Sequence, residues 1–175
     1  MNLTVRKATE KDFEAILRIY DAIHTEEENG RAVIGWIRGV YPEADTIRNA
    51  LARNDIFVAE EDGKVICTVI FNQIQVDSYK DAKWQFDASD REVMVMHTLV
   101  VDPAQKGRGI GKEIVRFYEE YALKNGCHYL RIDTNAKNEA ARRFYKKLGF
   151  SEAGIVPCDF NGIPGINLVL LEKKI

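Results

Sequence analysis

A glycine-rich segment near the middle of the chain has the residue types of an anion-binding loop. Its glycines alternate with larger residues at Gly107, Gly109 and Gly111. Glycine permits positive φ and lets the backbone approach a ligand without an intervening Cβ. Where such a loop opens a helix, free backbone N–H groups and the positive end of the helix dipole attract anions. The side chains that add positive charge here are Lys106, Arg108 and Lys112. The segment therefore predicts a pyrophosphate site.

Two common phosphate motifs do not fit this loop. The dinucleotide-binding fingerprint is G-x-G-x-x-G, whereas Gly107 to Gly111 read G-x-G-x-G, one residue short. The ATP-binding loop has four residues between its glycines and a hydroxyl after its lysine. Here three residues separate Gly107 from Gly111, and Glu113 follows Lys112. The loop belongs to neither class.

The elements that must position the loop follow from hydrophobic periodicity. Val93 to Val101 is almost wholly apolar, which predicts a central strand buried on both faces. The spacing of apolar residues from Ile110 predicts a long helix that ends near Gly126. A short strand is expected at Tyr129–Asp133, and a helix at Glu139–Leu148 that Gly149 ends.

The rest of the chain predicts further strands and two helices. Strands are expected at Leu3–Arg6, Ile56–Ala59, Val65–Phe71, Ser151–Val156 and Ile166–Leu171, and helices at Phe13–Tyr20 and around Ile47–Leu51. Asp62-Gly63 is a hairpin signal between two of these strands. Residues 76–91 are expected to form a loop, and Ala22–Pro42 has no clear pattern. The order β-α-α-β-β-β-α-β-α-β-β predicts an α/β protein with a mixed sheet of about seven strands.

Composition narrows the class of protein. The chain has 175 residues, which is the length of about one domain, and no linker divides residues 1–175. Twenty-five basic residues against 27 acidic ones give a net charge of −2, which does not favour general nucleic-acid binding. No apolar run approaches the ~20 residues of a membrane helix, and the N-terminus does not read as a signal peptide. Three widely spaced cysteines predict neither disulfides nor a metal site, but a reduced, cytoplasmic compartment.

Two elements in sequence carry a family resemblance. After Leu99-Val100-Val101-Asp102-Pro103, the segment Lys106-Gly107-Arg108-Gly109-Ile110-Gly111 is similar to the motif [Q/R]-x-x-G-x-[G/A], with Lys106 in place of Gln or Arg. Downstream, Asn138, Ala141, Phe144-Tyr145 and Lys147-Leu148-Gly149-Phe150 match a second element. In this order and separation they resemble the GNAT superfamily of N-acetyltransferases over nearly the whole chain. The resemblance implies a single GNAT-like domain, with a mostly antiparallel mixed sheet, helices on both faces, and acetyl-CoA as cosubstrate.

The resemblance also implies which residues bind acetyl-CoA. The pyrophosphate would contact Lys106, Gly107, Arg108, Gly109, Ile110, Gly111 and Lys112. The pantetheine arm would pair with the open edge of the strand at Leu99, Val100 and Val101, because its two amides can extend a backbone ladder. Asn138 either caps the following helix or also bonds the cofactor.

Acetyl transfer to an amine needs a base, an acid and an oxyanion donor. By the resemblance Tyr145 is the acid that protonates the departing thiolate, and an amide near Leu99 stabilises the oxyanion. His97 interrupts an apolar run, so it is either the base or a hydrogen-bonded core histidine. Glu92 and a relaying water are the other candidate bases. His97 and Leu99 share a face unless a bulge intervenes.

By the same resemblance the acceptor would be a small-molecule or peptide amine, and no residue identifies it. Residues that could line its pocket are Trp36, Tyr41, Trp84, Phe86 and the turn Phe160–Gly165, and Glu26, Glu27 and Glu28 could attract its charge. For each of them a place in the core or on a solvated face is the simpler interpretation.

Two other functions remain open from the sequence. A module that senses acetyl-CoA without catalysis would keep the glycine loop, although Tyr145 favours an enzyme. Binding to nucleic acid through the basic residues of the loop and of the helix at 139–148 is least favoured, because the phosphates of coenzyme A account for the same charges. A homodimer is left open.

Overall fold

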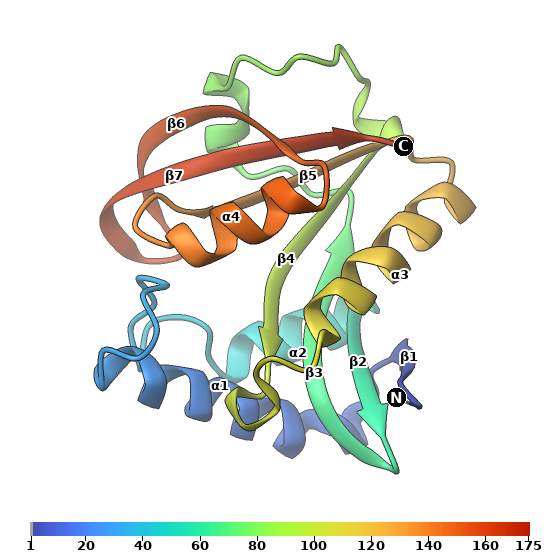
Figure 1. The fold of residues 1–175 in the computed structure, drawn as a ribbon, viewed down its shortest axis with the longest axis vertical. Helices are drawn as coiled ribbons and strands as arrows, with labels where there is room; N and C mark the ends of the chain where they lie inside the picture. The colour runs from blue at the N-terminus through green and yellow to red at the C-terminus, as the bar shows by residue number, and fades with distance from the viewer. Residues whose placement is uncertain (1) are drawn as a thin grey trace.

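The computed structural model describes residues 2–175 and contains one seven-stranded sheet with helices on both faces (Figure 1). The strands are β1 (Thr4–Lys7), β2 (Ile56–Glu61), β3 (Lys64–Asn72), β4 (Val93–Val101), β5 (Tyr129–Asn135), β6 (Ser151–Phe160) and β7 (Ile163–Lys174). The helices are α1 (Phe13–Glu28), α2 (Ala44–Arg53), α3 (Ile110–Lys124) and α4 (Glu139–Lys147). This is the element order that the periodicity predicts. The mixed α/β fold with helices on both faces is confirmed.

The sheet runs in the order β1-β2-β3-β4-β5-β7-β6. Only β4 and β5 are parallel, and every other neighbouring pair is antiparallel. The connection between β4 and β5 is α3, as expected for parallel strands, which need a crossover. The turn at Asp62-Gly63 joins β2 to β3 as predicted, with both residues at positive φ.

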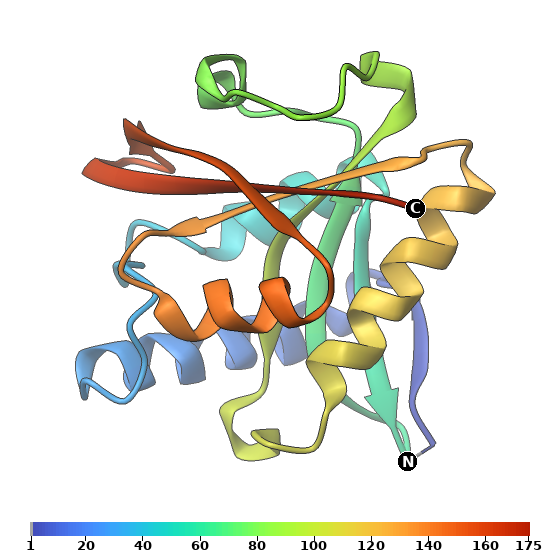
Figure 2. The ribbon, with the colours of Figure 1, turned by 45° about the horizontal axis from the view of Figure 1, so that its top comes forward.

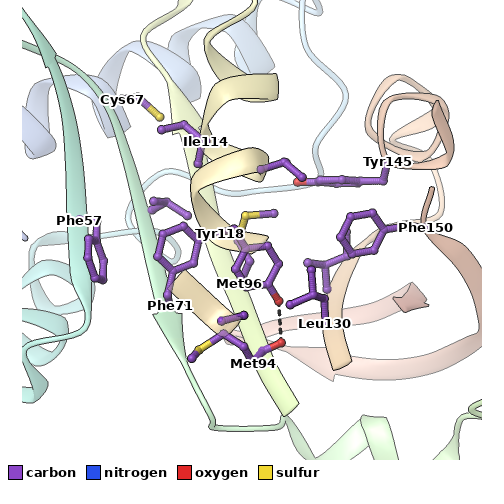
Figure 3. Close-up of a cluster of buried hydrophobic side chains, with 14 of the residues drawn as sticks. Phe57, Cys67, Phe71, Met94, Met96, Ile114, Tyr118, Leu130, Tyr145 and Phe150 are labelled. Carbon is purple, nitrogen blue, oxygen red and sulfur yellow. Dashed lines mark hydrogen bonds between the residues drawn. The ribbon is translucent and has the colours of Figure 1, made fainter. Parts of the chain in front are cut away.

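Apolar faces of the helices hold the layers together. On one face, Ile16, Ile19 and Tyr20 of α1 and Ile47 of α2 pack on the sheet. On the other face, Ile114 and Tyr118 of α3 pack on β2 to β5 (Figure 3). The Tyr118 hydroxyl donates to the carbonyl oxygens of Met94, at 2.6 Å, and Arg131, at 3.1 Å. One buried side chain of α3 thus bridges β4 and β5 where they lie closest.

The segment that had no clear pattern divides into two parts. Its first residues extend α1 to Glu28, and residues 29–43 then form a loop that returns across the end of the sheet. Glu27 holds this loop, because its carboxylate accepts the backbone N–H groups of Ile34, at 2.6 Å, and Gly35, at 2.8 Å. Residues 76–91 are a loop as predicted, with short 3-10 turns at each end.

The helices and the metal-ligating residue types within residues 2–175 form neither a membrane-spanning helix nor a cluster that could hold a metal ion. None of the helices combines the length and the apolar composition that a bilayer crossing requires. No group of three or more His, Cys, Asp or Glu residues in this part of the chain is arranged to hold a metal ion.

Candidate active site

The parallel strands β4 and β5 pair at one end and separate at the other. Their register runs from Val93↔Tyr129 to Met96↔Ile132 and then stops, and Figure 1 shows the two strands diverging beyond this point. We call the paired part the closed end. The open end comprises His97–Val101 of β4 and Asp133–Asn135 of β5. The first four residues of β4 are buried as predicted, but His97, Thr98 and Leu99 are partly exposed because they have lost a neighbouring strand.

A bulge lies at the start of the open end. Thr68 of β3 is opposite Val100, whereas Ile70 is opposite His97, so β4 carries an additional residue here. Thr98 has φ +51°, a left-handed conformation that is rare for a β-branched residue. The extra residue breaks the alternation, so His97 and Leu99 do not share a face by simple spacing.

Beyond the bulge, β4 keeps one unpaired edge. Val100 and Val101 align with Thr68 and Cys67 of β3 on one side, and no strand pairs with them on the β5 side. Leu99 lies within the bulge. The predicted edge at Leu99–Val101 is therefore present as a row of backbone groups that face the space between β4 and β5.

The glycine loop follows this edge after one short 3-10 turn at Pro103–Gln105. Gly107 has φ +84° and Gly109 has φ +79°, and an added Cβ at either would meet no atom within 4 Å. Within residues 2–175, no hydrogen bond uses the backbone N–H groups of Gly107, Gly109, Ile110 and Gly111. They lie at the N-terminus of α3, where the helix dipole is positive. These free N–H groups have the arrangement that the predicted anion site requires.

Two residues of the loop have additional roles in packing. The Ile110 side chain is buried in the core, so only its backbone faces the loop. A Cβ on Gly111 would lie 3.2 Å from the Phe144 ring of α4. Glycine at this position therefore lets α3 and α4 approach closely.

The basic side chains of the loop differ in their surroundings. Arg108 donates to Gln105 at 2.6 Å and forms an ion pair with Glu61 of the β2–β3 hairpin at 2.8 Å. Lys112 is exposed on the first turn of α3. Lys106 lines a pocket outside the open end. The guanidinium of Arg108 is thus already engaged, whereas the two lysines form no ion pair in the described part of the chain.

Two hollows meet at the open end. The inner cavity, of ≈ 170 Å³, lies between the separated strands, with walls from the loop after α1, α4 and the β6–β7 turn. The outer pocket, of ≈ 510 Å³, lies between the end of α1, the turn after β4 and the start of α4. Ile34 and Asn138 line both of them.

α4 presents two predicted residues to these hollows, and Figure 2 shows this helix beside the gap between β4 and β5. The Asn138 side chain caps the helix by accepting the Ala141 N–H at 3.1 Å, and its amide NH₂ makes no other hydrogen bond in residues 2–175. The Tyr145 ring packs on Phe144 and Phe150, and its hydroxyl end points from α4 toward β4 (Figure 3). Burial raises the pKa of Tyr145 above its usual value, so the phenol is neutral and can donate a proton.

His97 belongs to a hydrogen-bonded chain beside the inner cavity. Asp55 accepts the side-chain NH₂ of Asn72 at 2.9 Å, so the Asn72 oxygen faces His97 Nε2, also at 2.9 Å. The same oxygen accepts the Ile74 N–H at 2.9 Å. An acceptor at this position requires His97 to carry its proton on Nε2, which leaves Nδ1 unprotonated. Burial lowers the pKa of His97 to about 4, so its imidazole is neutral at pH 7.

Asp133 lines the inner cavity, and the sequence interpretation did not single it out. It is the first residue of β5 beyond the closed end. The Tyr79 hydroxyl donates to one of its oxygens at 2.7 Å. Burial raises the pKa of Asp133 to about 6. The only signal in the sequence was a carboxylate at the end of the short strand predicted at Tyr129–Asp133.

Comparison with known proteins agrees with this architecture. Residues 13–150 match the model of the acetyltransferase (GNAT) family. The chain belongs to the GNAT family. An uncharacterized N-acetyltransferase of Methanocaldococcus jannaschii is 30% identical over 156 residues, which are 87% of this chain and 62% of that protein, so the chain spans less than two thirds of this relative.

Solved structures share the GNAT fold. A GNAT-family acetyltransferase from Streptococcus agalactiae has a TM-score of 0.82 and 20% identity, over 100% of this chain and 96% of its own. The Salmonella typhimurium protein yncA, solved with its cofactor acetyl-CoA, has a TM-score of 0.69 and 20% identity, over 99% and 94% of the two chains. At these identities the likeness shows the fold alone.

Several candidates that the GNAT resemblance left open lie away from the cavity or have other partners. Glu92 is exposed at the opposite end of β4, where its carboxylate accepts the Ser89 hydroxyl at 2.7 Å, so we do not retain it as a base. Trp84 and Phe86 belong to the 76–91 loop, where Trp84 packs on Arg131 and Phe86 packs on Tyr129. Of the predicted pocket residues, those that line the inner cavity are Trp36, Tyr41 and, from the predicted turn, Phe160, Asn161 and Ile163.

The acidic run before the loop is structural in this GNAT fold. Glu26 pairs with Arg31 at 2.6 Å, and Glu28 pairs with Arg38 at 2.8 Å. Glu27 binds backbone N–H groups of the loop, as described above. All three carboxylates are therefore engaged in holding residues 29–43, and none faces the inner cavity.

Proposed function

We propose that the protein transfers an acetyl group from acetyl-CoA to a primary amine by direct attack. The observation that carries this proposal is the succession of two features along the chain: an unpaired strand edge leads, through one short 3-10 turn at Pro103–Gln105, into a loop of free N–H groups. Few ligands combine an amide-containing arm with a pyrophosphate, and acetyl-CoA does. The thioester of acetyl-CoA supplies the activated acetyl group.

Each part of the cosubstrate has a suitable partner. The pantetheine amides can pair with the open edge of β4 at Leu99–Val101, as an added strand does. The pyrophosphate can accept the free N–H groups of the glycine loop, near Lys106 and Lys112. The unpartnered NH₂ group of Asn138 lies where it can donate to the arm between them. Arg108 would first have to leave Glu61.

Asp133 is the residue best suited to accept the proton of the acceptor. An alkylammonium must lose a proton before its nitrogen can attack the thioester carbonyl. With a pKa of about 6, the Asp133 carboxylate is ionised at pH 7, and the Tyr79 hydroxyl orients it. The imidazole of His97, with a pKa of about 4, is a weaker base, so we assign it a hydrogen-bonding role through Nδ1.

The departing thiolate of coenzyme A also needs a proton. As the carbon–sulfur bond breaks, the thiolate takes a proton from the Tyr145 hydroxyl, which lines the inner cavity and has no hydrogen-bond partner in residues 2–175. The attacking nitrogen loses its second proton as the amide forms, and this proton restores the Tyr145 hydroxyl. A backbone N–H of the bulge near Leu99 stabilises the oxyanion. The products are an N-substituted acetamide and coenzyme A. Cys67 is fully buried with a raised pKa, which is consistent with direct transfer without a cysteine nucleophile.

Thermal unfolding with acetyl-CoA, NAD and ATP, offered separately at equal concentration, tests the first half of the proposal. A ligand at 100 times its Kd adds about 2.7 kcal/mol, which raises Tm by about 5–10 °C in a domain of this size. We expect this rise with acetyl-CoA alone. A rise with NAD or ATP only would contradict the assignment of the loop.

Tyr145→Phe tests whether the protein is an enzyme or a sensor. We expect this variant to keep the acetyl-CoA shift in Tm and to lose about 10–100-fold in kcat for release of free thiol with an amine, because the acid is absent. Phe144→Leu, next to it on α4, is the control for packing and should keep kcat. Unchanged turnover in Tyr145→Phe would contradict the acid role, and binding without any turnover in the wild type would favour the sensor.

A further inference from the structure

The charged side chains of the two hollows are segregated. The outer pocket contains four basic residues, Arg31, Lys106, Lys137 and Arg143. The pocket also contains three carboxylates, of which Glu26 is paired with Arg31, Glu139 with Arg143, and Asp102 with Arg18. Within residues 2–175, the inner cavity is lined by no Arg or Lys, and its only carboxylate is Asp133. The outer pocket thus has two lysines, Lys106 and Lys137, that form no ion pair within residues 2–175, whereas no cation lines the place where the acceptor amine must meet the thioester.

His97 adds no positive charge to the inner cavity. The hydrogen bonds that link Asp55, Asn72 and His97 fix the His97 proton on Nε2, which donates it to Asn72 and not to a ligand in the cavity. The remaining ring nitrogen carries a lone pair, so it accepts a hydrogen bond from an amine and repels an anionic oxygen. The other polar groups of the wall are neutral amides and hydroxyls, such as Asn135, Asn161 and Thr98.

An anionic group beside the acceptor amine would be unfavourable in this cavity. A carboxylate or phosphate there would lose water without gaining a cation, and burying an unpaired charge costs several kcal/mol. It would also be repelled by the Asp133 carboxylate. A lone ammonium, in contrast, gains Asp133 as its partner and the Trp36 and Tyr41 rings as neighbours, which lie edge to face with centroids 5.8 Å apart.

The remaining wall is apolar. Phe160, Ile163, Ile166 and Leu168 of the β6–β7 hairpin and Val76 of the loop after β3 contribute it. Burial of apolar substituent surface against these side chains stabilises the complex by roughly 25 cal/mol per Å². The cavity thus joins one acidic position for an ammonium to a wall for an uncharged, apolar substituent.

We propose that the acceptor is a primary amine with an apolar or aromatic substituent and no anionic group near the nitrogen. This excludes free amino acids and phosphorylated amino sugars. It includes arylalkylamines, amino-acid esters and the N-terminal amine of a peptide, in which the carboxylate is blocked. The inference rests on the proposed function, because it assumes that acetyl transfer takes place in the inner cavity.

Matched substrates test the inference directly. The compounds are 2-phenylethylamine, phenylalanine methyl ester, free phenylalanine and a peptide that begins with phenylalanine and ends in an amide. We expect kcat/KM for thiol release to be at least about 100-fold higher for the amine and the ester than for free phenylalanine. The peptide distinguishes a peptide acceptor from a small-molecule acceptor. A rate well above that of the ester indicates a peptide substrate, and an equal or lower rate indicates a small amine. Free phenylalanine as good as its ester would overturn the inference.

A variant that supplies the missing charge sharpens this test. Ile166 is partly exposed on the cavity wall, so Ile166→Arg can be accommodated and places a cation there. We expect it to narrow the ratio between ester and free phenylalanine at least tenfold, whereas Ile166→Met, of similar length and no charge, leaves the ratio unchanged. An equal change in both variants would show that the cavity does not select by charge.

A readout without turnover distinguishes the two possible failures. The Tm of the protein with coenzyme A is measured before and after each compound is added. If acetyl-CoA neither raises Tm nor releases thiol, the proposed function fails. The inference on the acceptor is wrong in two cases in which acetyl-CoA does bind. In the first, free phenylalanine is the only compound that raises Tm or reacts; in the second, no compound raises Tm or reacts.

Discussion

The closed and open ends of the β4–β5 pair differ although they belong to the same two strands. At the closed end, Met94 and Met96 are buried, both strands are hydrogen-bonded, and Tyr118 bridges their carbonyl oxygens. At the open end the ladder stops, a bulge forms at Thr98, and polar groups of His97 and Asp133 face a cavity. The closed end resembles any buried core. The open end shows that a site can arise where a strand loses one neighbour and its backbone becomes available to a ligand.

Of the substitutions that test this comparison, Asp133→Asn should have the largest effect on activity. We expect Asp133→Asn to lower kcat/KM by about 10²–10⁴-fold, because the variant lacks the base. Ile132→Val, the adjacent change at the closed end, is the control, with a stability cost of about 0.5–1.5 kcal/mol and activity within about twofold. Equal activity losses in both variants would remove the distinction between the two ends. Thiol-release kinetics and thermal unfolding measure both quantities.

The pH dependence of the wild type tests the same residue. Because burial raises the pKa of Asp133 to about 6, the carboxylate is protonated as pH falls through 6, and kcat/KM should drop about tenfold per pH unit below it. Tyr79→Phe removes the hydrogen bond that lowers this pKa, so the drop should begin at higher pH. The folded-state pKa lies above that of the unfolded chain, so this group also makes the protein less stable as pH rises toward 6, an effect absent in Asp133→Asn. A profile that Asp133→Asn leaves unchanged would assign the titration to another group.

A smaller effect is expected from replacing two glycines, one at the N-terminus of α3 and one in the β2–β3 turn. Gly109 follows the open end, whereas Gly63 lies in the hairpin of two fully paired strands, and both have positive φ and open space around a Cβ. Replacement of either by Ala should cost about 1–2 kcal/mol of stability, because left-handed backbone disfavours a side chain. Only Gly109→Ala should also raise the Kd for acetyl-CoA, by about tenfold, as measured by calorimetry. The same Kd in both variants would argue against the glycine loop as the phosphate site.

The smallest effect concerns the ion pair that holds Arg108. Partly exposed ion pairs contribute about 0–1 kcal/mol, so freeing Arg108 in Glu61→Gln should tighten acetyl-CoA binding by at most about fivefold. The control is Glu60→Gln, whose carboxylate pairs with Arg6 on the far side of the hairpin. Weaker binding in Glu61→Gln would mean that Glu61 positions Arg108 for the cosubstrate rather than competing for it.

The fold was largely predictable from the sequence, because its strands and helices have strong periodicity and clear end signals. The glycine loop was predictable for a related reason, since alternating glycines between a buried strand and a helix are typical of a turn that binds an anion. The long loop at residues 29–43 was not, because it is held by Glu27 and by ion pairs of Arg31 and Arg38 rather than by a repeating pattern. Long-range polar contacts leave no periodic signal.

Asp133 is the residue of the proposed site that the sequence interpretation did not single out. An aspartate at a strand end is ordinary in sequence, and its role depends on two facts of tertiary structure: β5 lies parallel to β4, and the pairing stops one residue earlier. His97 shows the opposite case, because it was noticeable as a polar residue in an apolar strand. Its partner Asn72, which sets the tautomer, is 25 residues away in the chain.

The unpaired edge of β4 also bears on aggregation. An exposed strand edge offers free N–H and C=O groups to any other strand, and proteins usually shorten or cover such edges. Here β1, at one margin of the sheet, has only four residues, and β6, at the other, is interrupted by register shifts. The edge of β4 lies in the middle of the sheet, facing a cavity of ≈ 170 Å³ between elements of the same chain. Because elements of the same chain surround it, this edge is less open than a sheet margin to pairing with a strand of a second folded protein.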